Sequence, residues 1–356
     1  MTGRGIDQIL PHPVDPRLHE TGMPSARCYV ERAARQHGAL EAPVDFDSPW
    51  GALPEAIAAF APALRLANFE TVISTSDDAW PGKRYHFRMH PDNAPCLRAM
   101  RFDCLSLANN HVLDWGPAGL EHTVRSLHGM GIRTAGAGAD EAEAAQPAVL
   151  ALPGGGRVLV FAVATPCSHV AAAWAAGPGR PGVNLLGDFS DRSLARVAAA
   201  IAAFRLPGDL VVLSVHWGGN WGFDIPPRQR EFAHRLVDSA GVDIVHGHSP
   251  HHVQGIEVHR GKLIIYGCGD LLNDYERIAG QAEFLHDQSA VFLPVIARDS
   301  GRLVALAMLP TRIRRMRVDP AGAAASARLE ELLDRECRKL GTRVVPGPAG
   351  CLALKW

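Results

Sequence analysis

The segment His246–His252 holds the most chemically suggestive side chains of this chain. Four histidines fall within seven residues, directly after the strand-like run Val242–Val245. An apolar, β-branched run that ends in histidines is typical of a buried strand that delivers metal ligands to its exit loop. Gly247 permits a tight backbone path and Pro250 fixes the next turn, so neighbouring imidazoles can converge. A surface histidine run is the alternative, and three further polar clusters favour the metal site.

The first of these clusters, Asn109–His111, follows the strand-like segment Phe102–Leu105. An asparagine carbonyl oxygen is a neutral ligand that suits a metal shared with carboxylates. The adjacent histidine can donate a proton or stabilise negative charge on a substrate oxygen. In isolation, the same residues are equally compatible with an Asn-Asn turn and a surface histidine.

Two more strand-like segments end in a possible ligand. Glu70 follows the segment Leu66–Phe69, and His216 ends the nearly continuous apolar run Leu210–Val215. Alone, the first would suit a solvated loop and the second a capped core strand. Four strand ends with N or O donors are what a two-metal hydrolytic centre at the carboxyl edge of a sheet requires, because two divalent ions can hold a bridging hydroxide there.

The order and spacing of these motifs resemble the CapA family, which is named for capsule and poly-gamma-glutamate synthesis and looks like a branch of the metallo-dependent phosphatase superfamily. The resemblance runs from the first residues to about Asp287, and it is specific for the family but not for a substrate. It rests on the stretches Asn68–Glu70, Ala108–His111, Asp114–Gly116, Gly119–Leu120, His216–Gly218, Gly247–His251, Gln254–Glu257 and Gly261–Asp270.

The resemblance implies an α/β fold, namely a four-layer αββα sandwich of the metallo-dependent phosphatase type with metal ligands on its loops. It also implies two divalent ions, such as Mn, Fe or Zn, because mixed His, Asn and carboxylate ligands do not select one metal sharply. By this resemblance, the expected metal-site residues are Glu70, Asn110, His216, His246, His248 and His251.

The same resemblance assigns catalytic roles to three other residues. His111 would be the proton donor or oxyanion stabiliser, Asn68 a site-orienting group, and Asp114 a further member of the catalytic set. His246 departs from the family pattern, in which an apolar residue often stands at that position.

The amino-terminal segment also departs from the family pattern. Family members open with an apolar strand that leads into Gly-Asp and a Met-x-Gly-Arg-Gly-like segment, and that Asp is expected to bind metal. The present sequence starts at Met1–Asp7, just after the place where Gly-Asp should stand. We expect the first strand and its carboxylate to be missing because the start was assigned to an internal methionine; a natural loss of both is the alternative. Asp7 is not expected to replace the carboxylate.

Charge and composition narrow the range of partners. Lys and Arg number 36 against 37 Asp and Glu, for a net charge of -1, so no bulk attraction to nucleic acid is expected. An anionic polymer, a peptide or a phosphate ester would have to be bound locally. The candidate side chains for this are Arg84, Arg88, Arg101, Arg228 and Arg230.

The seven cysteines are scattered and often lie in apolar runs, which favours reduced thiols and a cytoplasmic location. No apolar run reaches the length of a membrane span, although a signal or anchor upstream of the present start would change this expectation.

Strand-like and helix-like segments alternate, as a layered α/β fold requires. We expect one domain over residues 1–310, with residues 311–356 forming a linker, a helix and a terminal strand packed on it. The loop Thr165–Asn184 is either a lid or a surface insertion. The expected helices are Trp50–Arg65, Pro117–Met130, Ser190–Phe204, Pro227–Ala240 and Arg328–Leu340, and Val158–Ala164 is an expected strand.

These expectations lead to a CapA-type metal-dependent hydrolase that acts on a polyglutamate or capsule polymer through amide or peptide chemistry. A phosphoesterase is the second hypothesis, because the superfamily points to phosphate esters. A non-catalytic accessory subunit for polymer assembly is the third, and the missing Gly-Asp is its main argument.

Overall fold

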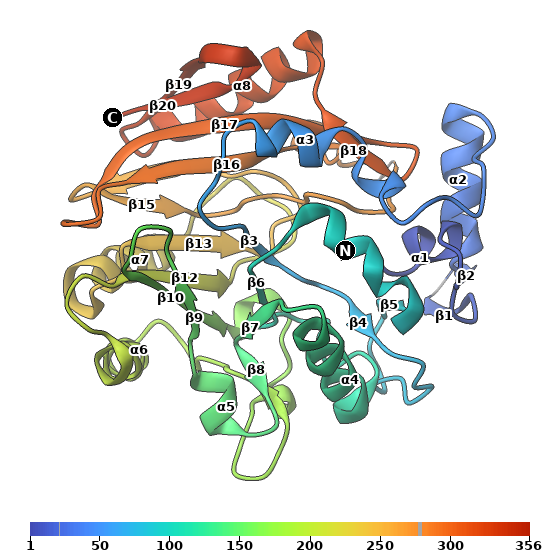
Figure 1. Ribbon diagram of the computed structural model, residues 1–356, viewed down its shortest axis with the longest axis horizontal. Helices are drawn as coiled ribbons and strands as arrows, with labels where there is room; N and C mark the ends of the chain where they lie inside the picture. The colour runs from blue at the N-terminus through green and yellow to red at the C-terminus, as the bar shows by residue number, and fades with distance from the viewer. Residues whose placement is uncertain (21, 277–279) are drawn as a thin grey trace.

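Six strands form the central sheet of this protein, in the order β14-β15-β13-β12-β10-β9 (Figure 1). The computed structural model describes residues 1–20, 22–276 and 280–356. The strands are β9 Ala148–Ala151, β10 Arg157–Ala164, β12 Leu210–His216, β13 Ile244–His248, β14 Ile256–His259 and β15 Lys262–Ile265. The four inner strands run parallel, and β9 and β14 pair antiparallel at the two edges. The inner strands therefore end at one edge of the sheet.

Strand β10 is apolar throughout because both of its faces are buried. Leu159, Phe161 and Val163 pack in one cluster with helices α6 Asp191–Phe204 and α7 Pro227–Ala240. The alternate residues of β10 join a second cluster on the opposite face of the sheet. A parallel strand that is buried on both faces needs this continuous apolar run.

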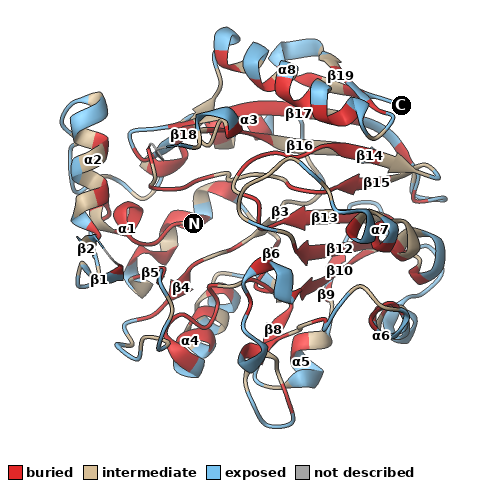
Figure 2. Cartoon of the chain, turned by 180° about the vertical axis from the view of Figure 1, so that it is seen from behind, coloured by how far each residue is buried: buried red, intermediate tan, exposed pale blue. Residues whose placement is uncertain are grey.

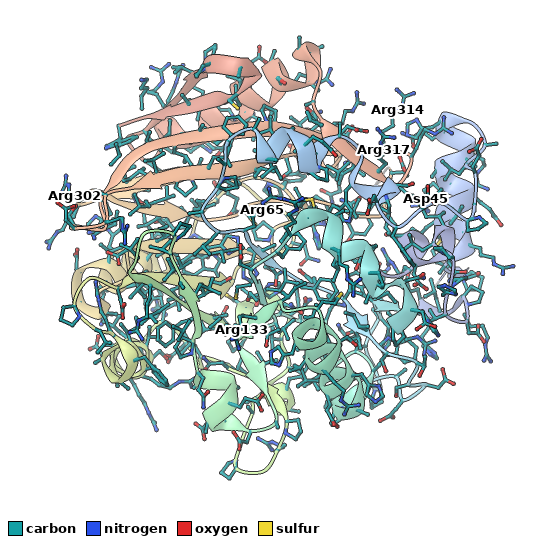
Figure 3. The ribbon with its side chains drawn as sticks, in the orientation of Figure 1. Asp45, Arg65, Arg133, Arg302, Arg314 and Arg317 are labelled. Atoms are coloured by element: carbon teal, nitrogen blue, oxygen red, sulfur yellow. The ribbon has the colours of Figure 1, made fainter. Side chains whose placement is uncertain are left out.

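A second sheet of five strands lies over part of that opposite face. Its order is β16-β17-β20-β19, with β18 paired to β17. Helix α8 Ala323–Arg338 packs on it. Figure 3 shows Arg302, which directly precedes β17, and Arg314, its last residue, at opposite sides of the molecule. The strands are β16 Gln288–Ile296, β17 Leu303–Arg314, β18 Arg317–Pro320, β19 Arg343–Pro346 and β20 Leu352–Lys355.

A third, smaller sheet completes the framework of the site. Its parallel strands are β3 Leu66–Asn68, β6 Cys104–Ser106 and β7 Arg133–Ala135, in the order β3-β6-β7. Polar segments follow β3 and β6, and helix α4 Gly116–Gly129 comes after the second of them. Figure 2 shows the inner strands buried and the outward faces of the helices exposed.

Shorter elements fill the remaining chain. They are α1 Gly5–Ile9, β1 Arg17–Glu20, β2 Met23–Ser25, α2 Arg27–His37, η1 Ser48–Trp50, α3 Leu53–Ala58, β4 Val72–Ile73, β5 Arg88–Met89, η2 Pro91–Met100, β8 Ala137–Gly138, α5 Glu141–Ala145, η3 Pro166–Ser168, η4 Ala172–Trp174, β11 Gly182–Val183, η5 Ala282–Phe284 and η6 Pro348–Gly350.

The structure confirms an α/β fold, and four of the five expected helices are present with small shifts of their ends. The helix expected over Trp50–Arg65 is wrong, because only Leu53–Ala58 is α-helical. Ala61 adopts a positive φ of 45° and a proline follows it, so the helix cannot continue to β3. Strand β17 runs through the boundary expected at residue 310.

No helix within the described ranges combines the length and the apolar character that a membrane crossing requires.

Candidate active site

Three imidazoles, those of His216, His246 and His248, lie at the carboxyl edge of the central sheet. We call these three side chains and Ser214 the imidazole edge. The ladder between β12 and β13 pairs His216 with His248. Their Nδ1 atoms lie 2.8 Å apart, so one ring donates a hydrogen bond to the other. The Ser214 hydroxyl lies 2.8 Å from His248 Nε2 and 3.1 Å from His246 Nδ1. Strand register alone thus brings three of the predicted ligands to one place.

Glu70 approaches the site from the end of β3 and is held by Asn68, which is itself held by Asn109. The Asn68 amide donates to Glu70 Oε2 at 2.8 Å, and the Asn109 amide donates to Asn68 Oδ1 at 3.0 Å. Glu70 Oε1 lies 3.9 Å from His111 Nε2. Asn68 therefore orients the Glu70 carboxylate, and its catalytic role stays a prediction.

His111, Asp114 and Lys83 form a buried group, which we call the carboxylate network. His111 Nδ1 lies 2.6 Å from Asp114 Oδ2, and the Phe87 amide donates to the same oxygen at 2.6 Å. Lys83 Nζ also donates to Asp114 and lies 3.0 Å from His111 Nδ1. Because the carboxylate accepts the Nδ1 proton, the other ring nitrogen, Nε2, faces Glu70 and remains available to a ligand.

Burial controls the charges in this network. It lowers the pKa of His111 well below its usual range, and the Lys83 charge lowers it further. Burial raises the pKa of Asp114 to about 6, against the opposing effect of Lys83, and it lowers the pKa of Lys83. His111 is therefore a neutral imidazole near pH 7, and its Nε2 is directed at Glu70.

His251 is paired with Asp270, which lies five residues beyond β15. Its Nδ1 is 3.1 Å from both carboxylate oxygens, and the Asn273 amide donates to Asp270 Oδ2 at 2.9 Å. Burial acts to lower the pKa of His251, but Asp270 and Glu70 together raise it above its usual value. A metal ligand must be a neutral imidazole, so metal binding by His251 would release a proton.

The loop between β10 and β11 covers the Lys83 side of the site. Trp174, in the short turn η4, has its ring centroid 5.0 Å from Lys83 Nζ and packs edge-on against Trp80 at 5.4 Å between centroids. Trp174 is almost completely buried. The Thr165–Asn184 segment thus contributes a packed side chain to the site and is not simply an exposed insertion.

The donor atoms fit a divalent metal in kind, although they are not assembled as one cluster. Asn110 Oδ1 and His216 Nε2 are buried and lack a hydrogen-bond partner among the described residues, and both are atoms that bind divalent metals. Across residues 1–20, 22–276 and 280–356, no group of three or more His, Cys, Asp or Glu side chains could hold a metal ion. The ligand set therefore stays a prediction.

Sequence reasoning missed three residues that shape this site. Lys83 lies in a Pro-Gly-Lys loop without any recognisable pattern, and Ser214 is hidden inside an apolar strand. Asp270 stands after a strand-like run, as Glu70 does, so its position gave a signal that could have been used. Of the arginines expected to bind substrate, Arg88 pairs with Asp77 and Arg230 with Glu257.

Residues 1–275 match the family described as bacterial capsule synthesis protein PGA_cap. This range contains every residue of the imidazole edge and of the carboxylate network.

Curated relatives extend the comparison. The probable polyglutamine synthesis accessory protein of Mycobacterium tuberculosis is 44% identical over 353 residues, which cover 99% of this chain and 93% of the relative. The PGA biosynthesis protein CapA of Bacillus subtilis is 28% identical over 192 residues, covering 54% of this chain and 48% of the relative. The capsule biosynthesis protein CapA of Bacillus anthracis is 29% identical over 192 residues, covering 54% and 45%.

Proposed function

Because this chain belongs to the bacterial capsule synthesis protein family PGA_cap, we propose that it is a metal-dependent hydrolase-type enzyme that acts on a polymer of glutamate or glutamine during its synthesis or processing. The observation that carries the proposal is that two buried atoms, Asn110 Oδ1 and His216 Nε2, have no hydrogen-bond partner among the described residues and lie in the site of a neutral His111.

The metal would be held by Glu70, Asn110 and the imidazoles of His216, His248 and His251, with His246 as a further donor. Bound there, a divalent pair would polarise the bond to be cleaved and supply activated water. The unpaired atoms Asn110 Oδ1 and His216 Nε2 support metal binding, because a buried polar atom without a partner costs free energy unless a ligand binds it.

The carboxylate network would accept and donate the proton that is transferred in the reaction. Asp114 holds the Nδ1 proton of His111, which leaves Nε2 as the base that accepts a proton and later returns it to the leaving amine. Lys83 balances the buried carboxylate, and the Phe87 ring stacks on the imidazole with 3.7 Å between centroids. These contacts fix the ring orientation, which supports a catalytic role better than a purely structural one.

The polymer substrate is supported by the printed names of the relatives, which refer to polyglutamine synthesis and to PGA or capsule biosynthesis. Seven free cysteines are compatible with work in a reducing compartment. The two large facing sheets with helices outside them support the finer proposal of a four-layer αββα sandwich.

A non-catalytic accessory subunit is the second candidate. The name of the mycobacterial relative and the lack of a three-residue metal cluster among the described residues favour it.

Metal content and product release separate these functions. Purified protein would be analysed by elemental analysis and offered poly-gamma-glutamate, polyglutamine peptide and an aryl phosphate. We expect bound divalent metal and release of glutamate or glutamine units, both lost in His248→Ala but kept in the control His259→Ala, whose ring pairs with Asp238 outside the site. Phosphate release alone would favour a phosphoesterase. A folded protein that neither binds metal nor cleaves any of these substrates would favour the accessory role.

A further inference from the structure

A cleft of about 630 Å³ lies at the amino-terminal ends of helices α6 and α7, outside the candidate site. The segment that leaves β10, the turn before α6 and one face of α7 line it. Phe232 of α7 packs with Leu213 and Val215 of β12, so the cleft lies on the helical face of the central sheet. Ser214 and His216 alternate with those β12 residues and point to the opposite face. The cleft and the imidazole edge thus lie on the two sides of one sheet edge.

The segment that leaves β10 separates the cleft from the candidate site. The Thr165 amide donates to the His216 carbonyl at 3.0 Å, and Thr165 Oγ1 donates to the same oxygen at 3.1 Å. Cys167 is exposed in the cleft wall, and its sulfur accepts a hydrogen bond from the Gly218 amide at 3.3 Å. Because one loop lies between them, a polymer that crosses this loop would contact both the candidate site and the cleft.

The charges that line the cleft do not favour a polyanion. Three carboxylates face two guanidinium groups there, and the charged residues are Asp188, Asp191, Glu231, Arg228 and Arg235. Asp191 pairs with Arg235, whereas Asp188 accepts hydrogen bonds from the start of α6. The excess of negative charge would repel a run of substrate carboxylates, but it would not repel a neutral chain.

Arg228 and Glu231 have no hydrogen-bond or ionic partner within residues 1–20, 22–276 and 280–356. They stand three residues apart on α7, so their side chains share the face that lines the cleft. A guanidinium group only donates hydrogen bonds and a carboxylate only accepts them, whereas a carboxamide does both through its nitrogen and its oxygen. The rings of Phe189 and Phe232, with 5.1 Å between centroids, add an apolar surface beside this pair.

We propose that this cleft binds the carboxamide side chains of a neutral polymer, with the amide oxygen on Arg228 and the amide nitrogen on Glu231. The proposal rests on the proposed function for the kind of polymer, and it narrows the substrate to glutamine-type side chains. Phe189 would cover the methylene groups of the bound unit. Because the ligand carries no net charge, its binding should change little with salt concentration.

The test measures the binding of three capped octapeptides, of glutamine, glutamate and serine, to the chelator-treated full chain. The readout is the rate at which iodoacetamide alkylates Cys167, followed by mass spectrometry, because this exposed thiol lines the cleft. At twice its dissociation constant, the glutamine peptide should slow this alkylation about threefold. The glutamate and serine peptides should leave the rate unchanged. Cys28 in α2, outside the cleft, is the internal reference for all three peptides.

Single substitutions on the exposed surface of α7 then identify the contacts. Arg228→Gln and Glu231→Gln should each weaken binding of the glutamine peptide about tenfold, as the loss of a hydrogen bond to a charged group does. Arg328→Gln and Glu331→Gln, at exposed positions of α8, are matched controls and should bind as the unmodified chain does. Glu231→Lys reverses the excess charge of the cleft and should raise its affinity for the glutamate peptide, whereas Glu331→Lys should not.

The outcomes for the cleft and for the proposed function are distinguishable. Cleavage of the glutamine peptide by the metal-loaded chain, without protection of Cys167 and without an effect of Arg228→Gln or Glu231→Gln, would overturn the cleft and keep the hydrolase. Protection that depends on both side chains, without any cleavage, would keep the cleft and favour an accessory protein that holds the polymer. Equal protection of Cys167 by the glutamate or serine peptide would also overturn the cleft proposal.

Discussion

The imidazole edge and the carboxylate network meet in one site, yet they are positioned in different ways. His216 and His248 are set by the parallel ladder of two neighbouring strands, and moving either ring requires the sheet to move. His111 is set by the side chains of Asp114 and Lys83, and the backbone amide of Phe87 in turn donates to Asp114. Backbone register therefore fixes the imidazoles of His216 and His248, while a network of buried charges fixes His111.

The largest effect on stability is expected from Gly247→Ala, which places a methyl group against the backbone beside the imidazole edge. A Cβ at this residue would lie 2.3 Å from the Tyr266 carbonyl oxygen and 2.6 Å from Trp217 Nε1. The sheet would have to open, so we expect a loss of about 3 kcal/mol or more in the free energy of unfolding, measured by urea denaturation. Gly219→Ala, where the nearest atom is 3.9 Å away, is the control and should be nearly neutral. Equal stability of both variants would mean that register does not hold this edge rigidly.

Asp114→Asn tests the carboxylate network next. It leaves the Lys83 ammonium, 17% exposed, without its buried carboxylate, so we expect a loss of about 3 kcal/mol in chemical denaturation. Adding Lys83→Met should recover part of the loss, because the uncompensated charge is then removed. Asp77→Asn, at an exposed carboxylate, should change stability by less than about 0.5 kcal/mol. A loss that the second substitution does not reduce would contradict the charge-pair interpretation.

Acid should lower the free energy of unfolding by protonating His246 of the imidazole edge. Burial lowers its pKa to about 4, against an ordinary value of 6.5, so between these pH values the unfolded state binds more protons than the folded state. Its contribution to stability is thus present above pH 6.5 and is lost as the pH falls toward 4. Because the ring lines an internal cavity and is half-buried, we expect only about 1 kcal/mol, measured as the difference in pH dependence between the chelator-treated protein and its His246→Gln variant.

His259→Gln, at a surface ion pair, should leave that pH dependence unchanged. Parallel stability curves for the protein and His246→Gln would show that the His246 ring stays accessible to protons in the folded state.

Ser214→Ala should have the smallest effect. It removes one hydroxyl that contacts both His246 and His248, and a neutral hydrogen bond contributes about 1 kcal/mol. Thermal unfolding would measure the change, with Ser326→Ala in helix α8 as the control. A loss above about 3 kcal/mol would mean that the hydroxyl holds the whole imidazole edge together.

The two regions also differ in how far sequence could anticipate them. An apolar run ending in a histidine predicts a strand and its carboxyl end, so β12 and β13 and their imidazoles could be placed without coordinates. The fold class followed from the same alternation of strands and helices. Lys83 could not be found this way, because it lies in a loop and its contacts with His111 and Asp114 span 28 and 31 residues of the chain. The prediction of a helix as far as Arg65 was wrong for a local reason, since the apolar pattern continues past the backbone turn at Ala61.

The contact between Trp174 and Lys83 links the loop that follows β10 to the carboxylate network. Any movement of this indole would change the surroundings of the ammonium group and, through it, the basicity of His111. The conformation of one loop and the proton affinity of a buried imidazole are therefore coupled properties in this fold.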